Sequence, residues 1–184
     1  RPHVSIATLP GMAERTIVVN GFSKSYAMTG WRIGYAAGPK PIIKAMTSFQ
    51  SHAASNANSI AQYAAATAIS CGDKYIRSMI EEYNARRRLM HRMVNDIDGM
   101  SCNLPKGAFY IMASLKEIIG KSHKGRVIDG STSFAEMLLD EKRVAVVPAL
   151  AFGDDNYVRL SYAVSRQSIV EGMTRIRDFV NELE

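Results

Sequence analysis

A lysine and an arginine stand eight residues apart in the stretch SKSYAMTGWRIGY, residues 23–35, and both could do chemistry. A lysine amine becomes a nucleophile when partial burial and nearby positive charge favour its neutral form. Lys24 stands among apolar or small residues with Arg32 close behind it. An arginine offers five donors in a planar fork, which suits a phosphate held by two bonds. Gly30 and Gly34 would let the backbone approach such a ligand closely.

Pyridoxal phosphate is the cofactor that needs both an imine-forming lysine and a phosphate-binding arginine. The spacing of Lys24 and Arg32 is compatible with that chemistry. From the residues alone, a solvated lysine and a surface arginine remain the alternative, because most charged side chains are simply exposed.

Two short apolar runs must position this pair. The run RTIVVN, residues 15–20, predicts a buried strand, and WRIGYAAG, residues 31–38, predicts a second strand, with Lys24 on the loop between them. Residues 40–70 predict a helical stretch that is broken near SNANS. Asp73 can cap the next helix, which is expected to reach about Asp96.

The remainder of the sequence predicts a compact mixed unit of strands and helices. The expected strands are residues 107–115, 144–149 and 157–163. The polar segment 116–130 is expected to be an exposed loop, and residues 132–143 a helix. Ser165 can cap a last helix. The apolar face of that helix is expected to comprise Ile169, Met173, Ile176 and Val180.

Composition narrows the classes of protein. The chain has 184 residues, is 47% hydrophobic and has no apolar run long enough for a membrane span, so we expect a globular cytoplasmic protein. Cys71 and Cys102 lack metal or redox spacing and are expected to be reduced, and no metal site is predicted. The net charge is +6, and its densest cluster is RRRLMHR, residues 86–92. This cluster lies opposite an apolar helical stripe and lacks aromatic platforms, so nucleic acid is not the expected partner.

The segment NGFSKSYAMTGWRIGYAAGP, residues 20–39, resembles the cofactor-lysine segment of fold-type I, class I/II pyridoxal-phosphate aminotransferases, and most of all their aspartate aminotransferase-like branch. PKGAFYIM, residues 105–112, resembles the start of the family's small domain. VAVVPALAFGDDNYVRLSYAVS, residues 144–165, resembles its carboxylate-binding segment. The resemblance implies an α/β fold. Residues 1–98 would end the large cofactor-binding domain with its long interdomain helices, and residues 99–184 would form an α+β C-terminal small domain.

Carried over residue by residue, the resemblance makes Lys24 the residue that bonds the cofactor aldehyde as a Schiff base and afterwards shuttles a proton. Arg32, with help from Ser23, would bind the phosphate of pyridoxal 5'-phosphate. Arg159 would pair with the substrate α-carboxylate, which orients the reacting bond toward the lysine. The implied activity is transamination between an amino acid and a 2-oxo acid in amino-acid metabolism, carried out by a homodimer.

Several positions depart from the family pattern. Gly21 stands where many members have a phosphate-binding serine, and Pro148-Ala149-Leu150 replaces a frequent Pro-Gly-Ser. Ser51 stands where some aspartate-specific relatives carry an arginine, so the choice of amino acid stays open. No aspartate precedes Lys24, although the family's aspartate for the pyridine nitrogen lies upstream of the lysine. We therefore expect the C-terminal portion of a longer aminotransferase, which is inactive by itself.

Other proteins use a similar scaffold. One alternative is a pyridoxal-phosphate-dependent C–S lyase, because a fold does not fix a reaction. Another is the aminotransferase-like sensor module of a transcription regulator, which follows a DNA-binding segment. A third is a non-catalytic structural protein, in which the set of Lys24, Arg32 and Arg159 would be a coincidence. The coding sequence upstream of residue 1 would separate the enzyme from the regulator.

Overall fold

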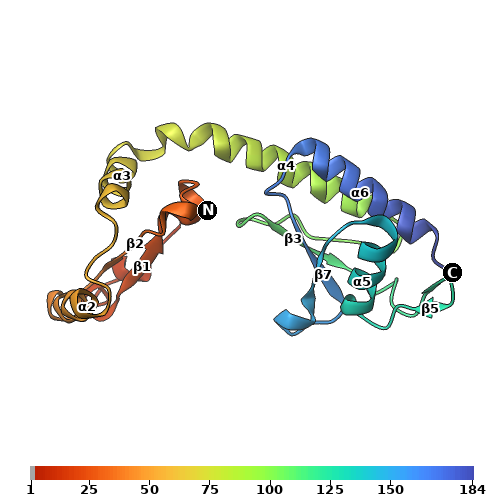
Figure 1. The fold of residues 1–184 in the computed structure, drawn as a ribbon, viewed down its shortest axis with the longest axis horizontal. Coiled ribbons are helices and arrows are strands. Elements are labelled where there is room, and N and C mark those ends of the chain that lie inside the picture. The colour runs from red at the N-terminus through yellow and green to blue at the C-terminus, as the bar shows by residue number, and fades with distance from the viewer. Residues whose placement is uncertain (1–2) are drawn as a thin grey trace. The chain divides into compact units, whose positions relative to one another are not determined.

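The computed structural model describes residues 3–184, except for the side chain of Asp73, and has a mixed α/β fold (Figure 1). It divides into two compact units, Arg1–Arg77 and Ser78–Glu184. The helices of the described residues are α1 Phe22–Ser25, α2 Lys40–Ala53, α3 Ser59–Ser70, α4 Arg77–Asn95, α5 Ser131–Lys142 and α6 Arg166–Asn181. The 3-10 turns are η1 Ile6–Thr8, η2 Ala13–Arg15, η3 Thr29–Trp31, η4 Gly72–Tyr75 and η5 Ala149–Phe152. The strands are β1 Val18–Gly21, β2 Gly34–Ala37, β3 Tyr110–Ser114, β4 Ser122–His123, β5 Arg126–Val127, β6 Val147–Pro148 and β7 Tyr157–Ser161.

The first unit is built on an antiparallel ribbon of β1 and β2, which pair from Val18↔Ala37 to Gly21↔Gly34. Both predicted strands are therefore confirmed, although each is shorter than expected. The expected burial of the first strand is wrong, since Val19 is 74% exposed. A ribbon of two strands with a small apolar cluster at one end offers little surface on which a strand can be buried. The lysine connection is also not a loop: it begins with the one-turn helix α1.

The predicted break in the helical stretch after residue 40 is confirmed. Helix α2 carries Pro41 in its first turn, where the missing amide hydrogen is tolerated. It ends at Ala53, and α3 starts after Asn58, whose side-chain oxygen accepts a bond from the amide of Ala61 at 3.0 Å. Short polar residues compete with helical backbone bonds and favour such caps, which explains the break.

The second unit contains an antiparallel sheet in the order β3-β7-β6. The residues of this sheet alternate between a buried and an outward face, as strand geometry requires. The buried face is made of Ile111, Ala113, Val158 and Leu160. These residues share one core with α4, α5 and α6, and Figure 1 shows α6 running beside α4. The three predicted strands and the helix at 132–143 are confirmed, although β6 is reduced to two residues.

Helix α6 follows its prediction closely. The hydroxyl of Ser165 accepts a bond from the amide of Ser168 at 3.0 Å, so Ser165 is the N-cap. The four apolar residues predicted for its inner face are all at most 4% exposed. Helix α4 differs at its start, because it begins at Arg77 after the turn η4. The predicted cap at Asp73 lies outside the described side chains.

The segment 116–130 is not the exposed loop that its polarity predicts. It forms a small hairpin of β4 and β5, and Ile118 and Ile128 are completely buried. The strand β4 also pairs with the end of the chain, because Ser122 and Glu184 exchange two backbone bonds of 2.9 Å. Isolated apolar residues in a polar segment give no periodic signal, so their burial depends on tertiary contacts.

The division between the two compact units falls at 77/78. Met90 and Val94 of α4 belong to the core of the second unit, which draws most of this helix into it. The assignment of residues 1–98 and 99–184 to a large and a small domain stays a prediction. Cys71 and Cys102 are free thiols. Among the described helices, none is long and apolar enough to cross a membrane.

Candidate functional site

Lys24 lies in α1, on the connection that joins β1 to β2. Phe22 anchors this turn: its side chain is 3% exposed, and its amide donates to the carbonyl of Ile33 at 3.3 Å. Tyr26 packs against the Phe22 ring with 5.5 Å between ring centroids. The side chain of Lys24 is exposed, so the partial burial that would favour its neutral amine is not seen in this unit. A single helical turn can bury only one side, and that side belongs to Phe22.

Arg32 ends the turn η3 in a left-handed backbone conformation, with φ of +51°. Such a conformation costs a non-glycine residue about 1–3 kcal/mol and is found where the surrounding structure enforces it. One guanidinium nitrogen donates to the carbonyl of Thr29 at 3.0 Å, and the hydroxyl of Thr29 donates to the carbonyl of Ser23 at 3.0 Å. Thr29 therefore ties the arginine to the lysine-bearing helix.

The other donors of Arg32 have no acidic partner: among the described side chains, no carboxylate forms an ion pair with it. An exposed guanidinium without such a partner can accept an anionic ligand as a two-bond clamp. The half-buried Ser23 stands next to Lys24 on the same turn.

The glycines of this connection have different roles from those expected. A Cβ on Gly34 would lie 2.9 Å from the carbonyl oxygen of Asn20, so the pairing of the two strands itself requires glycine there. Gly30 faces open space within the described structure, which is compatible with a ligand beside it. A Cβ on Gly21 would meet only the carbonyl oxygen of Ile33, at 3.9 Å, so this position has room for a side chain.

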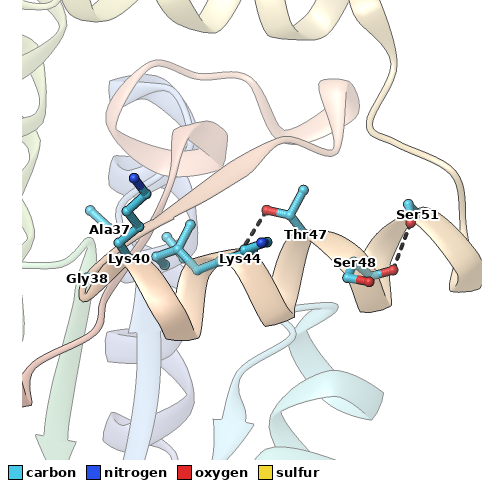
Figure 2. Close-up of a pocket in the computed structure, with 9 residues that line it drawn as sticks. Ala37, Gly38, Lys40, Lys44, Thr47, Ser48 and Ser51 are labelled. Atoms are coloured by element: carbon cyan, nitrogen blue, oxygen red, sulfur yellow. Dashed lines mark hydrogen bonds between the residues drawn. The ribbon is translucent and has the colours of Figure 1, made fainter.

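A hollow of about 690 Å³ lies elsewhere in the first unit, between the end of β2 and α2 (Figure 2). Its lining comprises Ala36, Ala37, Gly38, Lys40, Ile43, Lys44, Thr47, Ser48 and Ser51. The hydroxyls of Thr47 and Ser51 donate to helix carbonyls at 2.9 and 2.7 Å, so they are already used within α2. Neither Lys24 nor Arg32 lines this hollow, and it does not coincide with the predicted chemistry.

Arg159 lies in the second unit, on the central strand β7. It stands opposite Met112 of β3 and Val147 of β6, on the outward face of the sheet. Its guanidinium carbon lies over the ring of Tyr110, 4.4 Å from the centroid, and over the ring of Phe152, 4.8 Å from the centroid. No carboxylate among the described residues forms an ion pair with it.

The two aromatic contacts of Arg159 were missed by sequence reasoning. Strand alternation could have placed Tyr110 on the outward face, but only with knowledge of the β3–β7 register. Phe152 comes from the turn η5, where no periodicity applies.

The structure thus gathers Ser23, Lys24 and Arg32 on one connection of the first unit and places Arg159 on the sheet of the second. Together these residues offer one amine and two guanidiniums, a donor set for a phosphate and a carboxylate. Among the described residues, no group of acidic, histidine or cysteine side chains is placed to hold a metal ion.

Comparison with known proteins points in one direction. Residues 3–176 match the family model described as aminotransferase class I and II. An aspartate aminotransferase of Streptomyces avermitilis is 44% identical over 180 residues, which are 98% of this chain and 44% of that protein. A probable aspartate/prephenate aminotransferase of Rickettsia prowazekii is 45% identical over 175 residues, covering 95% of this chain and 44% of that protein.

Solved structures agree with this result. The aspartate aminotransferase of Rhizobium meliloti matches with a TM-score of 0.94 and 41% identity, covering 99% of this chain and 46% of that chain. The aromatic aminotransferase of Pyrococcus horikoshii matches with a TM-score of 0.86 and 42% identity, covering 99% and 47%. The chain therefore spans less than half the length of each of these relatives.

Proposed function

The chain belongs to the aminotransferase class I and II family, and on that premise we propose that it is the C-terminal part of a longer, pyridoxal-phosphate-dependent aminotransferase. The reaction is transfer of an amino group between an amino acid and a 2-oxo acid. The observation that carries the proposal is that Lys24 and Arg32 lie on the same connection between β1 and β2. The pairing of Gly21 with Gly34 brings the two ends of this connection together. The partial coverage of the relatives supports a longer enzyme, as do exposed side chains such as Phe49, which is 76% exposed.

Each residue has a defined task in this proposal. Bound pyridoxal phosphate supplies an electron sink for the charge that develops at the α-carbon of the amino acid. Arg32 would bind the phosphate, with Ser23 beside it, and Lys24 would hold the cofactor aldehyde until the amino group of the substrate displaces it. The Lys24 amine released in this exchange would then take the proton from the α-carbon and return it. Arg159 binds the α-carboxylate through two parallel bonds and so orients the substrate for this proton transfer.

The donor set of the described residues fits these tasks. Among the side chains that the structure describes, no carboxylate pairs with Arg32 or Arg159, and Gly30 leaves open space on the lysine connection. Ser51 is neutral, so it cannot supply a positive charge for a second substrate carboxylate. The relatives are named for aspartate, prephenate and aromatic substrates, and we leave the class at amino acid and 2-oxo acid. The proposal includes a homodimer in the cytoplasm, as the family resemblance implies.

The assignment of Lys24 is tested by adding pyridoxal phosphate to the full-length protein and reducing the lysine–cofactor bond with borohydride. Mass spectrometry of the digested protein should find the cofactor mass on the peptide that contains Lys24. Lys24→Ala should lose both this adduct and the absorbance of the lysine–cofactor bond. Lys44→Ala removes an exposed lysine from the same unit and should change neither. Equal absorbance of the lysine–cofactor bond in Lys24→Ala and in the parent protein would show that the assignment of Lys24 is wrong.

A second measurement concerns the activity of the chain itself. The 184-residue chain should show no or almost no transamination with 2-oxoglutarate and a panel of amino acids, whereas the full-length protein should be active. The reason is that no aspartate precedes Lys24 to hold the pyridine nitrogen protonated. Robust turnover by the 184-residue chain would contradict the proposal that further residues complete the site.

A further inference from the structure

Arg159 is held by aromatic rings rather than by an acidic side chain. The sheet order β3-β7-β6 places β7 between two neighbours. Tyr110 comes from β3 on one side, and Phe152 comes from η5, which directly follows β6 on the other side. Both rings have the Arg159 guanidinium carbon over them, at 4.4 and 4.8 Å from the ring centroids. The cation is thus contacted from both neighbouring segments of the sheet.

This arrangement leaves the N–H donors of the Arg159 guanidinium available. A cation over an aromatic ring is attracted by the negative ring face and is worth about 0.5–2 kcal/mol, depending on exposure. The N–H donors of a guanidinium lie in its plane and point away from its faces. Rings that contact the cation through this attraction therefore restrain the side chain without using its N–H donors. An acidic partner would have fixed the same side chain but would have consumed both the donors and the charge.

We propose that Tyr110 and Phe152 are positioning residues that orient Arg159 for an incoming carboxylate. This inference rests on the proposed function, because it assumes that Arg159 binds the substrate α-carboxylate. Because the rings take up none of the N–H donors, these donors stay available for the two parallel bonds that a guanidinium forms with a carboxylate. The two rings restrict the rotamers of the Arg159 side chain before a ligand binds. Less side-chain entropy is therefore lost when the carboxylate binds.

Contacts within the second unit hold the segments from which both rings come. The Tyr110 ring lies 4.4 Å from the ring of Phe109, centroid to centroid, and Phe109 packs against the core of the second unit. The turn before it is fixed as well, because the Tyr162 hydroxyl donates to the carbonyl of Ala108 at 2.9 Å.

The turn η5 that carries Phe152 starts at the completely buried Ala149. The hydroxyl of Ser131 accepts a bond from the amide of Leu150 at 3.3 Å and donates to the carboxylate of Asp155 at 2.6 Å. The start of this turn is therefore held by contacts within the second unit, while the Phe152 side chain itself is 54% exposed beside Arg159.

The test measures carboxylate binding and turnover separately in the full-length protein. Isothermal titration calorimetry with 2-oxoglutarate gives the affinity, and steady-state kinetics give KM and kcat. Phe152→Leu and Tyr110→Leu should each weaken binding about 3- to 10-fold and raise KM by a similar factor, while kcat changes less than about twofold. Phe152→Tyr and Tyr110→Phe keep the rings and should restore near-parental affinity.

Tyr157→Leu is the matched control. Tyr157 stands two residues before Arg159 on β7, and its ring lies under the amine of Lys116 at 5.6 Å from the centroid. Its loss removes a comparable ring–cation contact from the same strand and should leave 2-oxoglutarate binding unchanged. If Tyr157→Leu weakens binding as much as Phe152→Leu does, the effect is a general disturbance of the sheet, and the inference is wrong.

Arg159→Met separates this inference from the proposed function. Loss of binding in Arg159→Met together with parental affinity in both leucine variants overturns the positioning role and leaves the proposed function intact. Parental affinity in Arg159→Met overturns the role of Arg159 in the proposed function itself. Thermal unfolding of every variant by circular dichroism confirms that the compared proteins are folded.

Discussion

Gly21 leaves room for a side chain three residues before Lys24. Its backbone is extended, with φ of −138°, and a Cβ would lie 3.9 Å from its nearest neighbour, the carbonyl oxygen of Ile33. Many members of the family have a phosphate-binding serine at this position. A serine side chain would therefore have room at position 21, and no steric limit requires glycine there. At Gly34, by contrast, the close strand pairing does require glycine.

Gly21→Ser should strengthen binding of pyridoxal phosphate by the full-length protein by about tenfold, because a hydrogen bond to a charged group is worth about 1.5–3 kcal/mol before ordering costs. Gly21→Ala adds the same Cβ without a hydroxyl and serves as the control. Fluorescence titration with the cofactor measures both affinities. Indistinguishable dissociation constants for the two variants would show that the hydroxyl does not reach the phosphate.

At the scale of elements, a three-residue ion-pair network joins the start of α6 to α4. The carboxylate of Glu82 accepts bonds from Arg166, with 3.1 Å to its Nε, and from Arg86 at 2.7 Å. These hydrogen bonds lower the pKa of Glu82 from its ordinary 4.5 to about 2, and the bond from Arg166 has a larger effect than the bond from Arg86. The network therefore links two helices of the second unit through one charge.

This depressed pKa sets the sign of a pH dependence. Because the pKa of Glu82 is lower in the folded than in the unfolded state, its contribution to stability is present above about pH 4.5 and is lost as the pH falls toward 2. The destabilisation caused by Glu82→Gln should thus be largest above pH 4.5 and should shrink toward pH 2. Urea unfolding across this range measures it.

Glu81→Gln changes the neighbouring exposed residue and should show little effect at any of these pH values, since surface charges outside a network contribute little. A Glu82→Gln effect that stays constant from neutral pH to pH 2 would mean that packing, and not charge, accounts for it.

Elements whose signals are local were predicted well from the sequence. Ser165 and the apolar spacing of residues 169–180 define α6, and Asn58 explains the break before α3. Elements that depend on distant partners were not predicted. The hairpin β4–β5 owes its place to the burial of Ile118 and Ile128 and to pairing with the chain end, and neither leaves a periodic pattern.

The candidate site shows the same limit. The types and spacing of Lys24 and Arg32 were compatible with cofactor chemistry, and the family resemblance suggested that chemistry and the role of Arg159. These assignments stay predictions. The rings around Arg159 could not be predicted, because Tyr110 and Phe152 come from separate segments that only the sheet brings together. The sequence left open whether Lys24 is partly buried or solvated, and the structure shows it exposed, since the apolar residues that flank it in sequence do not surround it in space.

At the scale of the whole molecule, the two units bury very different amounts of apolar surface. The second unit has a continuous core that includes completely buried Phe134 and Phe179. The buried cluster beside the lysine connection contains Phe22, Met28 and Ala65. Local stability follows such burial, since segments with few buried apolar contacts open more readily. The residues proposed to bind the cofactor therefore stand in the less stabilised part of this chain.

Hydrogen exchange with mass spectrometry tests this difference and its origin. In the 184-residue chain, amides of β1 and β2 should exchange at least about tenfold faster than those of β3 and β7. In the full-length protein the first unit should gain protection, because its exposed apolar residues, among them Tyr63 at 79% exposure, become covered. Pyridoxal phosphate should then slow exchange further in residues 22–33, where Lys24 and Arg32 are proposed to bind it. Protection of the first unit that is already equal to that of the second in the 184-residue chain would show that it needs no further protein for its stability. In that case, the exposed apolar side chains of the first unit could no longer be explained by the absence of a longer protein's other residues.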